Sequence, residues 1–227
     1  MSFMKTNTVD ITVDGHTYNS LTDFGLAIGN TDYISEPLQP ANTLIYVPGS
    51  SKPLDITESV FGEQYFLSRN ISIHFGGMHP AEDWDGVMSQ LQTLFAGRIV
   101  QLTFANDPDW YWTGRAVIHK FSHRRSLGEF DFEIPYADPY KYKTTLTTYD
   151  ISGTTAGHSQ ICVCDRMPVV PNFYATQVCT LAFGSITKNL AVGNNSFTDI
   201  VFHEGNNEII VTGTGATVTV SYREGRL

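Results

Sequence analysis

The stretch GEFDFEIPYADPYKY, residues 128–142, decides how the chain is divided. Phenylalanine and isoleucine alternate with acids over residues 130–134, which predicts a strand with one apolar face and one wet face. Proline has no N–H for a sheet and biases the preceding residue toward extended geometry. We therefore expect the strand to stop at Pro135, and a stiff connection through Pro139 and Tyr140. The stretch is either a boundary between two domains or a surface loop within one domain.

The charge distribution favours the boundary. The chain has 227 residues and a formal net charge of −9. Residues 1–140 hold 8 Lys and Arg against 17 Asp and Glu, whereas residues 141–227 hold 6 of each. Because the imbalance ends at the quoted stretch, we predict two domains, 1–140 and 141–227. The negative charge argues against nucleic-acid binding, which needs clustered Lys and Arg.

Targeting signals and cysteine usage indicate the compartment. The N-terminus lacks the apolar core of a signal peptide, and no apolar run approaches the roughly 18 residues of a membrane span. The three cysteines, Cys162, Cys164 and Cys179, form no disulfide framework, and we expect the first two to pack in the core. The sequence thus predicts a protein made in a cytoplasm, with no membrane insertion.

Residues 1–140 predict a β-rich α+β domain with one helix. Asp14-Gly15 between two alternating runs predicts a β-hairpin. Trp84, Val87, Met88, Leu91, Leu94 and Phe95 recur at steps of three and four, which predicts an amphipathic helix within residues 80–97. One such helix covers one face of a sheet. The remaining apolar runs predict strands at 43–47, 71–75, 98–104, 110–121 and 130–134.

Residues 141–227 show no helical pattern. Seven short strands at this spacing are typical of a β-sandwich or barrel. In the last strand, Val218, Val220 and Tyr222 are expected to share one face. The predicted strands are 145–151, 160–164, 178–183, 189–193, 199–203, 208–212 and 217–222.

A metal site is conceivable around two histidines. His119 and His123 would share a face of a continuous strand, with Asp107 or Asp109 nearby. Zinc ligands usually come in tighter spacings with a supporting second layer of hydrogen bonds. We therefore predict structural or surface histidines and no metal.

Catalytic motifs are equally weak. Residues 185–188 match S-x-x-K, but the partner motifs of that enzyme class are missing. The acid pairs Asp83 with Asp85 and Glu129 with Asp131 are explained by solvated faces. No cofactor-binding loop is present. We predict no catalytic residue, no cofactor and no enzyme, while an acid-pair glycosidase stays the third hypothesis.

The densest aromatic cluster is DWYWTGR, residues 109–115. Alternation places Trp110 and Trp112 toward the core and Tyr111 outward. Exposed aromatic rings stack on sugars or anchor a protein partner, so all three residues are interface or sugar-stacking candidates. A carbohydrate-binding β-sandwich module is therefore the alternative function to a protein that acts by association.

Five landmarks taken in order resemble the distal tail proteins of long-tailed, non-contractile bacteriophages. They are YVPGSSKPLDITESVFG (46–62), RNISIHF (69–75), YWTGR (111–115), FDFEIPYADPYKY (130–142) and FHEGNNEIIVTGTGATVTVSYREGRL (202–227). The resemblance implies a mainly β fold, with an N-terminal ring-forming α+β domain and a C-terminal galectin-like β-sandwich. The prolines and Tyr140 would form the hinge between them.

The resemblance also implies a function and partners. Six copies would form a ring at the distal end of a phage tail, joining the tail tube to the host-recognition apparatus. The partners would be further copies of this chain, the tail tube protein, and the tail-associated lysin hub and receptor-binding proteins. The protein would reside in the virion tail. The family implies no catalytic residues, and the residue set that galectins use on sugar is not visible here.

Overall fold

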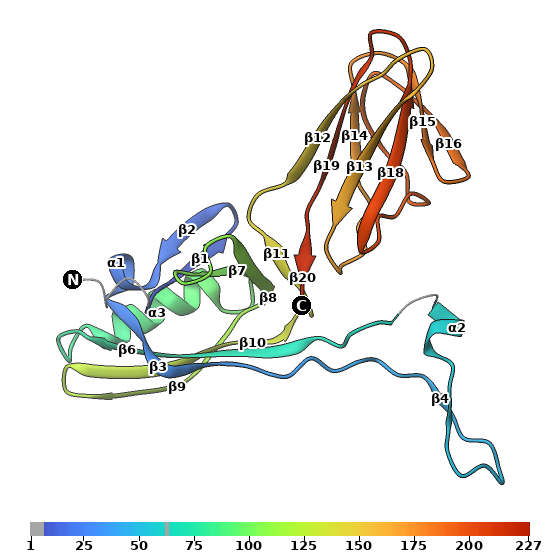
Figure 1. Ribbon diagram of the computed structural model, residues 1–227. Helices are drawn as coiled ribbons and strands as arrows, with labels where there is room; N and C mark the ends of the chain where they lie inside the picture. Colours follow the sequence, from blue (N-terminus) through green and yellow to red (C-terminus); the bar gives the residue numbers. More distant parts are fainter. Residues whose placement is uncertain (1–6, 62–63) are drawn as a thin grey trace. The chain divides into compact units, whose positions relative to one another are not determined.

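The computed structural model describes residues 7–61 and 64–227, with the side chains of all of these except residues 29–33 and 61. The chain divides into two compact units, Met1–Pro139 and Tyr140–Leu227, here called unit 1 and unit 2. Strands dominate both units (Figure 1), so the predicted mainly β fold is confirmed. Among the described residues, no helix has the length and apolar character to cross a membrane.

Unit 1 consists of two antiparallel sheets and three described helices. One sheet has the strand order β2-β1-β7-β8 within this unit, and the other has the order β3-β6-β10-β9. The elements are β1 (Val9–Val13), β2 (His16–Asn19), α1 (Ser20–Phe24), β3 (Leu26–Ser35), β4 (Leu44–Ile45), β5 (Leu54–Asp55), α2 (Thr57–Phe61), β6 (Arg69–Met78), α3 (Trp84–Phe95), β7 (Ile99–Phe104), β8 (Trp110–Arg115), β9 (Val117–Arg124) and β10 (Leu127–Ala137).

Both sheets and α3 contribute to one hydrophobic core. The predicted helix is confirmed, and its Trp84, Met88, Leu91 and Phe95 are buried there together with apolar residues of the strands. The predicted hairpin is also confirmed, since β1 pairs with β2. Its turn residues Asp14 and Gly15 both have positive φ, 49° and 81°, as a tight two-residue turn requires. The two five-residue helices α1 and α2 were not predicted, because they are too short for helical periodicity.

The predicted single strand over residues 110–121 is wrong. The chain leaves the first sheet after β8, passes through the fully buried Ala116, and enters the second sheet as β9. Ala116 N–H donates to Arg98 O at 2.9 Å, and Gly97 N–H donates to Ala116 O at 2.8 Å. Alternation carries no information about which neighbour a strand pairs with, so this change of sheet was invisible in the sequence.

The predicted strand end at Pro135 is also wrong. β10 runs on to Ala137, and its register with β6 shifts between Ile134 and Ala137. A proline is tolerated at such a bulge because no ladder hydrogen bond needs its missing N–H. The predicted alternation is confirmed, because Phe130, Phe132 and Ile134 are all buried.

Unit 2 is a β-sandwich. Its two antiparallel four-stranded sheets, β12-β19-β14-β17 and β13-β18-β15-β16, share one hydrophobic core, and β11 pairs with β20. Val218, Val220 and Tyr222 are buried on one face as predicted. The elements are β11 (Lys141–Lys143), β12 (Thr147–Ser152), β13 (His158–Cys164), β14 (Asn172–Ala175), β15 (Cys179–Phe183), β16 (Ile186–Leu190), β17 (Gly193–Ser196), β18 (Gly205–Thr212), β19 (Thr217–Tyr222) and β20 (Gly225–Arg226).

The strand predictions for the middle of unit 2 need correction. Residues 199–203 form no named strand and contribute only an isolated bridge between Phe202 and Val169. The apolar residues there fill the core from a loop, since Ile200 and Phe202 are fully buried. The predicted strand 189–193 is split, because β16 ends at Leu190, and β14 was missed.

Candidate interaction surfaces

The segment between β3 and β6, residues 36–68, is here called the arm. Its two halves run side by side, as Leu67 N–H donates to Gln39 O and Ala41 N–H donates to Tyr65 O, each at 2.9 Å. Figure 1 shows it leading away from the sheet to the small β4–β5 pair and α2. The arm is therefore a long hairpin excursion of unit 1.

Polar contacts order the end of the arm from within. Thr57 is only 2% exposed, and its N–H and hydroxyl both donate to Asp55 Oδ1, at 3.0 and 2.6 Å. The same hydroxyl oxygen accepts from Thr43 N–H at 2.7 Å. The hydrogen bonds from Thr57 lower the pKa of the Asp55 carboxyl, so this carboxylate stays ionised at neutral pH. These hydrogen bonds order the backbone at the end of the arm, where no described residue belongs to the hydrophobic core of unit 1.

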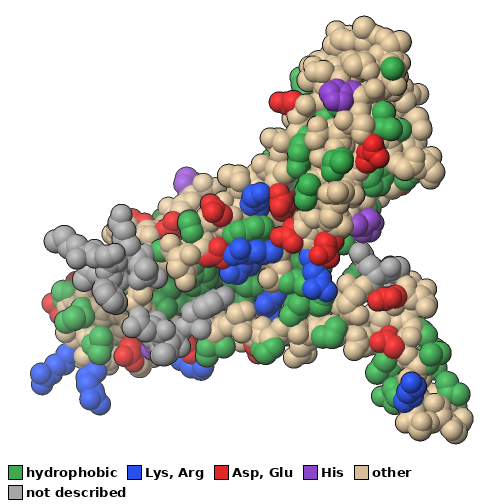
Figure 2. All heavy atoms as spheres, viewed as in Figure 1, with side chains coloured by type: hydrophobic (Ala, Val, Ile, Leu, Met, Phe, Trp, Pro, Cys, Tyr) green, Lys and Arg blue, Asp and Glu red, His purple; other side chains and the backbone are tan. Residues whose placement is uncertain are grey.

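Most of the large apolar side chains described in the arm are exposed. Figure 2 shows hydrophobic side chains gathered on it. Tyr46 is 78% exposed and Leu54 is 56% exposed, and neither belongs to the core of unit 1. Contiguous exposed apolar surface of this kind marks an interaction site. The exposed large hydrophobic residues are Leu44, Ile45, Tyr46, Val47, Leu54, Val60, Tyr65 and Leu67.

The sequence pointed elsewhere for the interface. The predicted candidates Trp110, Tyr111 and Trp112 open β8, and only Trp110 is more than marginally exposed. Trp112 is 2% exposed in the core, as alternation predicted, but Tyr111 is 8% exposed, so its predicted outward exposure is wrong. The buried rings of Tyr111 and Trp112 offer little surface to a sugar or partner. The sequence feature that could have indicated the arm is the apolar run TLIYV, residues 43–47. Prolines lie on both sides of this run, and they disfavour its pairing in a central strand.

The end of unit 1 is held by Arg69, the residue that opens β6. Its guanidinium lies 4.7 Å from the ring centroid of Trp112, and its Nη2 donates to the carbonyl oxygen of Pro139. Of the predicted hinge residues, Pro135 lies inside β10, Pro139 is the last residue of unit 1, and Tyr140 is the first residue of unit 2. Bending at this point stays a prediction.

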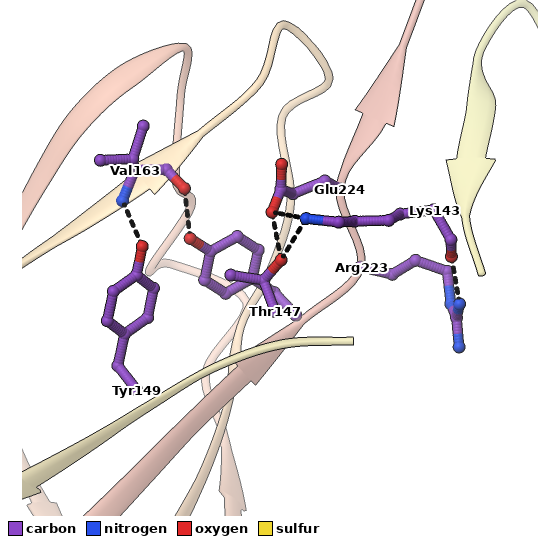
Figure 3. Close-up of polar contacts among 7 residues, drawn as sticks. Lys143, Thr147, Tyr149, Val163, Arg223 and Glu224 are labelled. Atoms are coloured by element: carbon purple, nitrogen blue, oxygen red, sulfur yellow. Dashed lines mark hydrogen bonds and ion pairs between the residues drawn. The ribbon is translucent and has the colours of Figure 1, made fainter. Parts of the chain in front are cut away.

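The first and last strands of unit 2 are tied together (Figure 3). Lys143 Nζ lies 2.9 Å from Glu224 Oε1 and 3.2 Å from Thr147 Oγ1. The Thr147 hydroxyl also donates to Glu224, and Arg223 Nη1 donates to the carbonyl oxygen of Lys143. Arg223 Nη1 also donates to Thr144 O at 2.9 Å. The segments by which the chain enters and leaves unit 2 are therefore fastened to each other.

Two tyrosines connect the sheets of unit 2 beside this network (Figure 3). The Tyr222 hydroxyl donates to Val163 O, while the Tyr149 hydroxyl accepts from Val163 N–H at 3.3 Å. Burial is the main cause that raises the pKa of Tyr222, so this hydroxyl stays a donor at neutral pH. The contacts join β13 of one sheet to β12 and β19 of the other.

Several residues that the sequence suggested as catalytic or reactive candidates have structural roles. Lys188 of the S-x-x-K match lies on a strand and pairs with Asp199 at 2.5 Å. Burial raises the pKa of the Cys162 and Cys164 thiols to about 11, which keeps them protonated and poorly nucleophilic. Asp85 lies in the first turn of α3, where a carboxylate favours the positive end of the helix dipole.

His119 and His123 do not share a face, contrary to the sequence expectation. The register between β9 and β10 shifts so that two residues of β9, Lys120 and Phe121, lie opposite the single residue Phe130 of β10. His123 stacks on Phe121, which packs against the core, whereas His119 Nε2 lies 3.0 Å from Glu133 Oε2. One inserted residue reverses the alternation, and nothing in the sequence announces it.

Comparison with known proteins identifies the fold. No protein-family model matches the chain, and neither does any curated protein. Among solved structures, the chain is similar to the Dit protein of phage SPP1, described as a paradigm of the hub adsorption apparatus in phages that infect Gram-positive bacteria. The TM-score is 0.64 at 14% identity, and the match covers 96% of this chain and 99% of the other. The resemblance to distal tail proteins is thus confirmed at the level of the fold.

Proposed function

We propose that this chain is a structural component of a phage tail tip, where six copies form a hub ring between the tail tube and the host-recognition apparatus. Its role is assembly, and its partners are further copies of itself, the tail tube protein, and the tail-associated lysin hub and receptor-binding proteins. The observation that carries the proposal is the likeness to a phage hub protein over 96% of this chain and 99% of that one. A fold shared over both units argues for a shared architecture.

The arm supports the ring. A closed ring needs a heterologous interface, in which one patch of each subunit binds a different patch of the next. The arm offers such a patch, because its apolar residues are exposed and lie outside the core of their own unit. We assign its occupant as the neighbouring copy of this chain. Each subunit would then hold the next one, and the last would hold the first.

Unit 2 is suited to contact the proteins beyond the ring. Its exposed sheet face carries Ile161 and Val163 on β13 and Ile210 on β18, at 48%, 52% and 38% exposure. Apolar residues interspersed with polar ones are typical of a protein–protein contact. The ion pair between Lys143 and Glu224 would help to keep this face in place while the partner binds.

The test is the mass of the full-length protein in solution. We expect light scattering on a sizing column, across a concentration series, to give a species near six times 25.2 kDa. A second arm adds purified tail tubes as a template, because some rings close only on a surface. A strict monomer at every concentration, both alone and with tubes, would contradict the proposal.

Carbohydrate binding is the second candidate function. A shallow hollow in unit 2 is lined by Phe183, Asn206, Glu208 and Ile210. An aromatic edge beside amide and carboxylate groups is a combination that sugars bind. Saturable binding on a glycan array that is lost in Glu208→Ala would favour this function. The absence of binding to any glycan would leave the hub as the sole proposal.

A further inference from the structure

A row of ionisable side chains crosses the second sheet of unit 1. On β10, Asp131 is in register with His74 of β6 on one side and His119 of β9 on the other. Side chains directly opposite in antiparallel strands lie on the same face. Phe130 and Phe132 point from β10 into the core, so this row lies on the other face. Glu133 lies two residues further along the same face.

The donor atoms of this row converge. His119 Nε2 lies 3.0 Å from Glu133 Oε2, and His74 Nδ1 lies 2.7 Å from Asp131 Oδ1. Potential ligand atoms of His119, Asp131 and Glu133 all lie within 4.8 Å of one another. Tetrahedral zinc with bonds of about 2.0–2.1 Å separates its ligand atoms by roughly 3.3 Å. His74 lies outside this group of three and is joined to it through its contact with Asp131.

The charge of the face favours a cation. Glu129, Asp131 and Glu133 line it at alternate positions, and Lys120 Nζ pairs with Asp131 Oδ2 at 2.8 Å. Burial alone would raise the pKa of Asp131, but hydrogen bonds from Lys120 and His74 lower it, so the carboxylate is ionised at neutral pH. Three carboxylates therefore lie on this face beside one lysine ammonium. A divalent ion would offset the remaining negative charge.

We propose that His74, His119, Asp131 and Glu133 bind one Zn²⁺. Two imidazole nitrogens with two carboxylates are a donor set that zinc accepts, whereas Mg²⁺ and Ca²⁺ prefer oxygen ligands alone. The ion can enter from solvent, because the His74 and His119 side chains are 40% and 32% exposed. It would fasten β6, β9 and β10 together and stabilise unit 1 through binding to the folded state. This proposal is independent of the hub function.

Lys120 distinguishes a metal site from two histidine–carboxylate ion pairs. Its ammonium occupies Asp131 Oδ2 and must leave when the carboxylate binds a metal. The side chain is 69% exposed and can turn into solvent. The charge-removing variant Lys120→Gln should therefore bind Zn²⁺ several-fold more tightly than the wild type. Ion pairs alone predict no such gain.

The test is calorimetric titration of ZnCl₂ into the metal-free, full-length protein without an affinity tag. We expect one Zn²⁺ per chain, loss of binding in His74→Ala and in His119→Ala, and no competition from Mg²⁺. His123→Ala is the matched control, because His123 lies on the same strand but stacks on the other face, so binding should persist. Circular dichroism checks that each variant is folded.

Three results would overturn the proposal. The first is that the wild type binds no Zn²⁺ at concentrations up to the millimolar range. The second is one-to-one binding that survives both folded histidine variants, which would place the ion elsewhere in the chain. The third is that Lys120→Gln, whose exposed side chain contributes little to folding, binds Zn²⁺ no more tightly than the wild type.

Discussion

If the proposed ring forms through the arm, removing apolar surface from the arm should open it without unfolding the chain. The double variant Tyr46→Ser with Leu54→Ser replaces side chains that are 78% and 56% exposed in the single chain. Complete burial of such a side chain contributes about 1.5–3 kcal/mol, and the contribution scales with the area still exposed beforehand. If the neighbouring subunit covers both, the pair contributes about 3 kcal/mol to each interface. Since about 1.4 kcal/mol is tenfold in affinity, the interface should weaken more than a hundredfold.

The assay is sedimentation velocity of the variant and the wild type over the same concentration series. The fraction of ring should fall sharply, while the melting temperature of the dissociated chain stays near that of the wild type. The matched control is Val178→Ser with Val192→Ser, which removes apolar side chains that are 72% and 63% exposed in unit 2. Equal assembly of the arm variant and the wild type, or equal loss in the control, would refute the reasoning.

Three further predictions concern the packing of the units. Gly114→Ala should lower the unfolding free energy by about 1–3 kcal/mol, because a Cβ there meets the side chain of Ile134 and lies 3.2 Å from the backbone of Ala137. In contrast, Gly86→Ala meets nothing within 4 Å and should be neutral or stabilising in urea titrations. The thiols of β13 should react slowly with a disulfide reagent at pH 8 until denaturant is added. Because burial raises their pKa to about 11, the unfolding free energy should fall as pH rises from 9 to 11, and fast labelling of the native chain would contradict their burial. By calorimetry, Glu224→Gln should destabilise unit 2 by about 1–2 kcal/mol, whereas Asp199→Asn, which removes a charge from a more exposed pair, should destabilise it less.

The sequence predicted several of the longer elements in which one face is buried and the other is wet. The helix Trp84–Phe95 and the alternation of Phe130, Phe132 and Ile134 are of this kind, and both were found as predicted. Burial on one face imposes a period of 3.6 or 2 on the sequence, and that period can be recognised without knowing what covers the face.

The errors fall where the structure depends on distant partners. Pro135 suggested the end of a strand, but a bulge accommodates it within β10. The inserted residue in β9 carries His119 and His123 to opposite faces. Ala116 is the point where the chain changes sheets, although the local pattern is unbroken. Register and sheet membership are decided by the neighbouring strand, which a single segment does not encode.

The candidate site was harder to predict than the fold. The aromatic residues of β8 attracted attention because of their type, yet Trp112 supports the core. Residues 43–47 of the arm were predicted as one more strand, since exposure of an apolar run cannot be inferred from the run itself. Only the two-residue strand β4 forms there. The exposed apolar surface of the arm is evident only from the structure, in which the side chains of Tyr46 and Leu54 are exposed to solvent in the single chain.

The position of the protein in a virion tests the central claim most directly. Under the proposed function the gene belongs to a phage, so gold-labelled antibody raised against unit 2 would be applied to purified particles of that phage and viewed by electron microscopy. The proposal predicts label confined to the distal end of the tail, at the junction with the host-recognition apparatus. Label on the capsid or along the tube, or particles that lack the protein altogether, would contradict it.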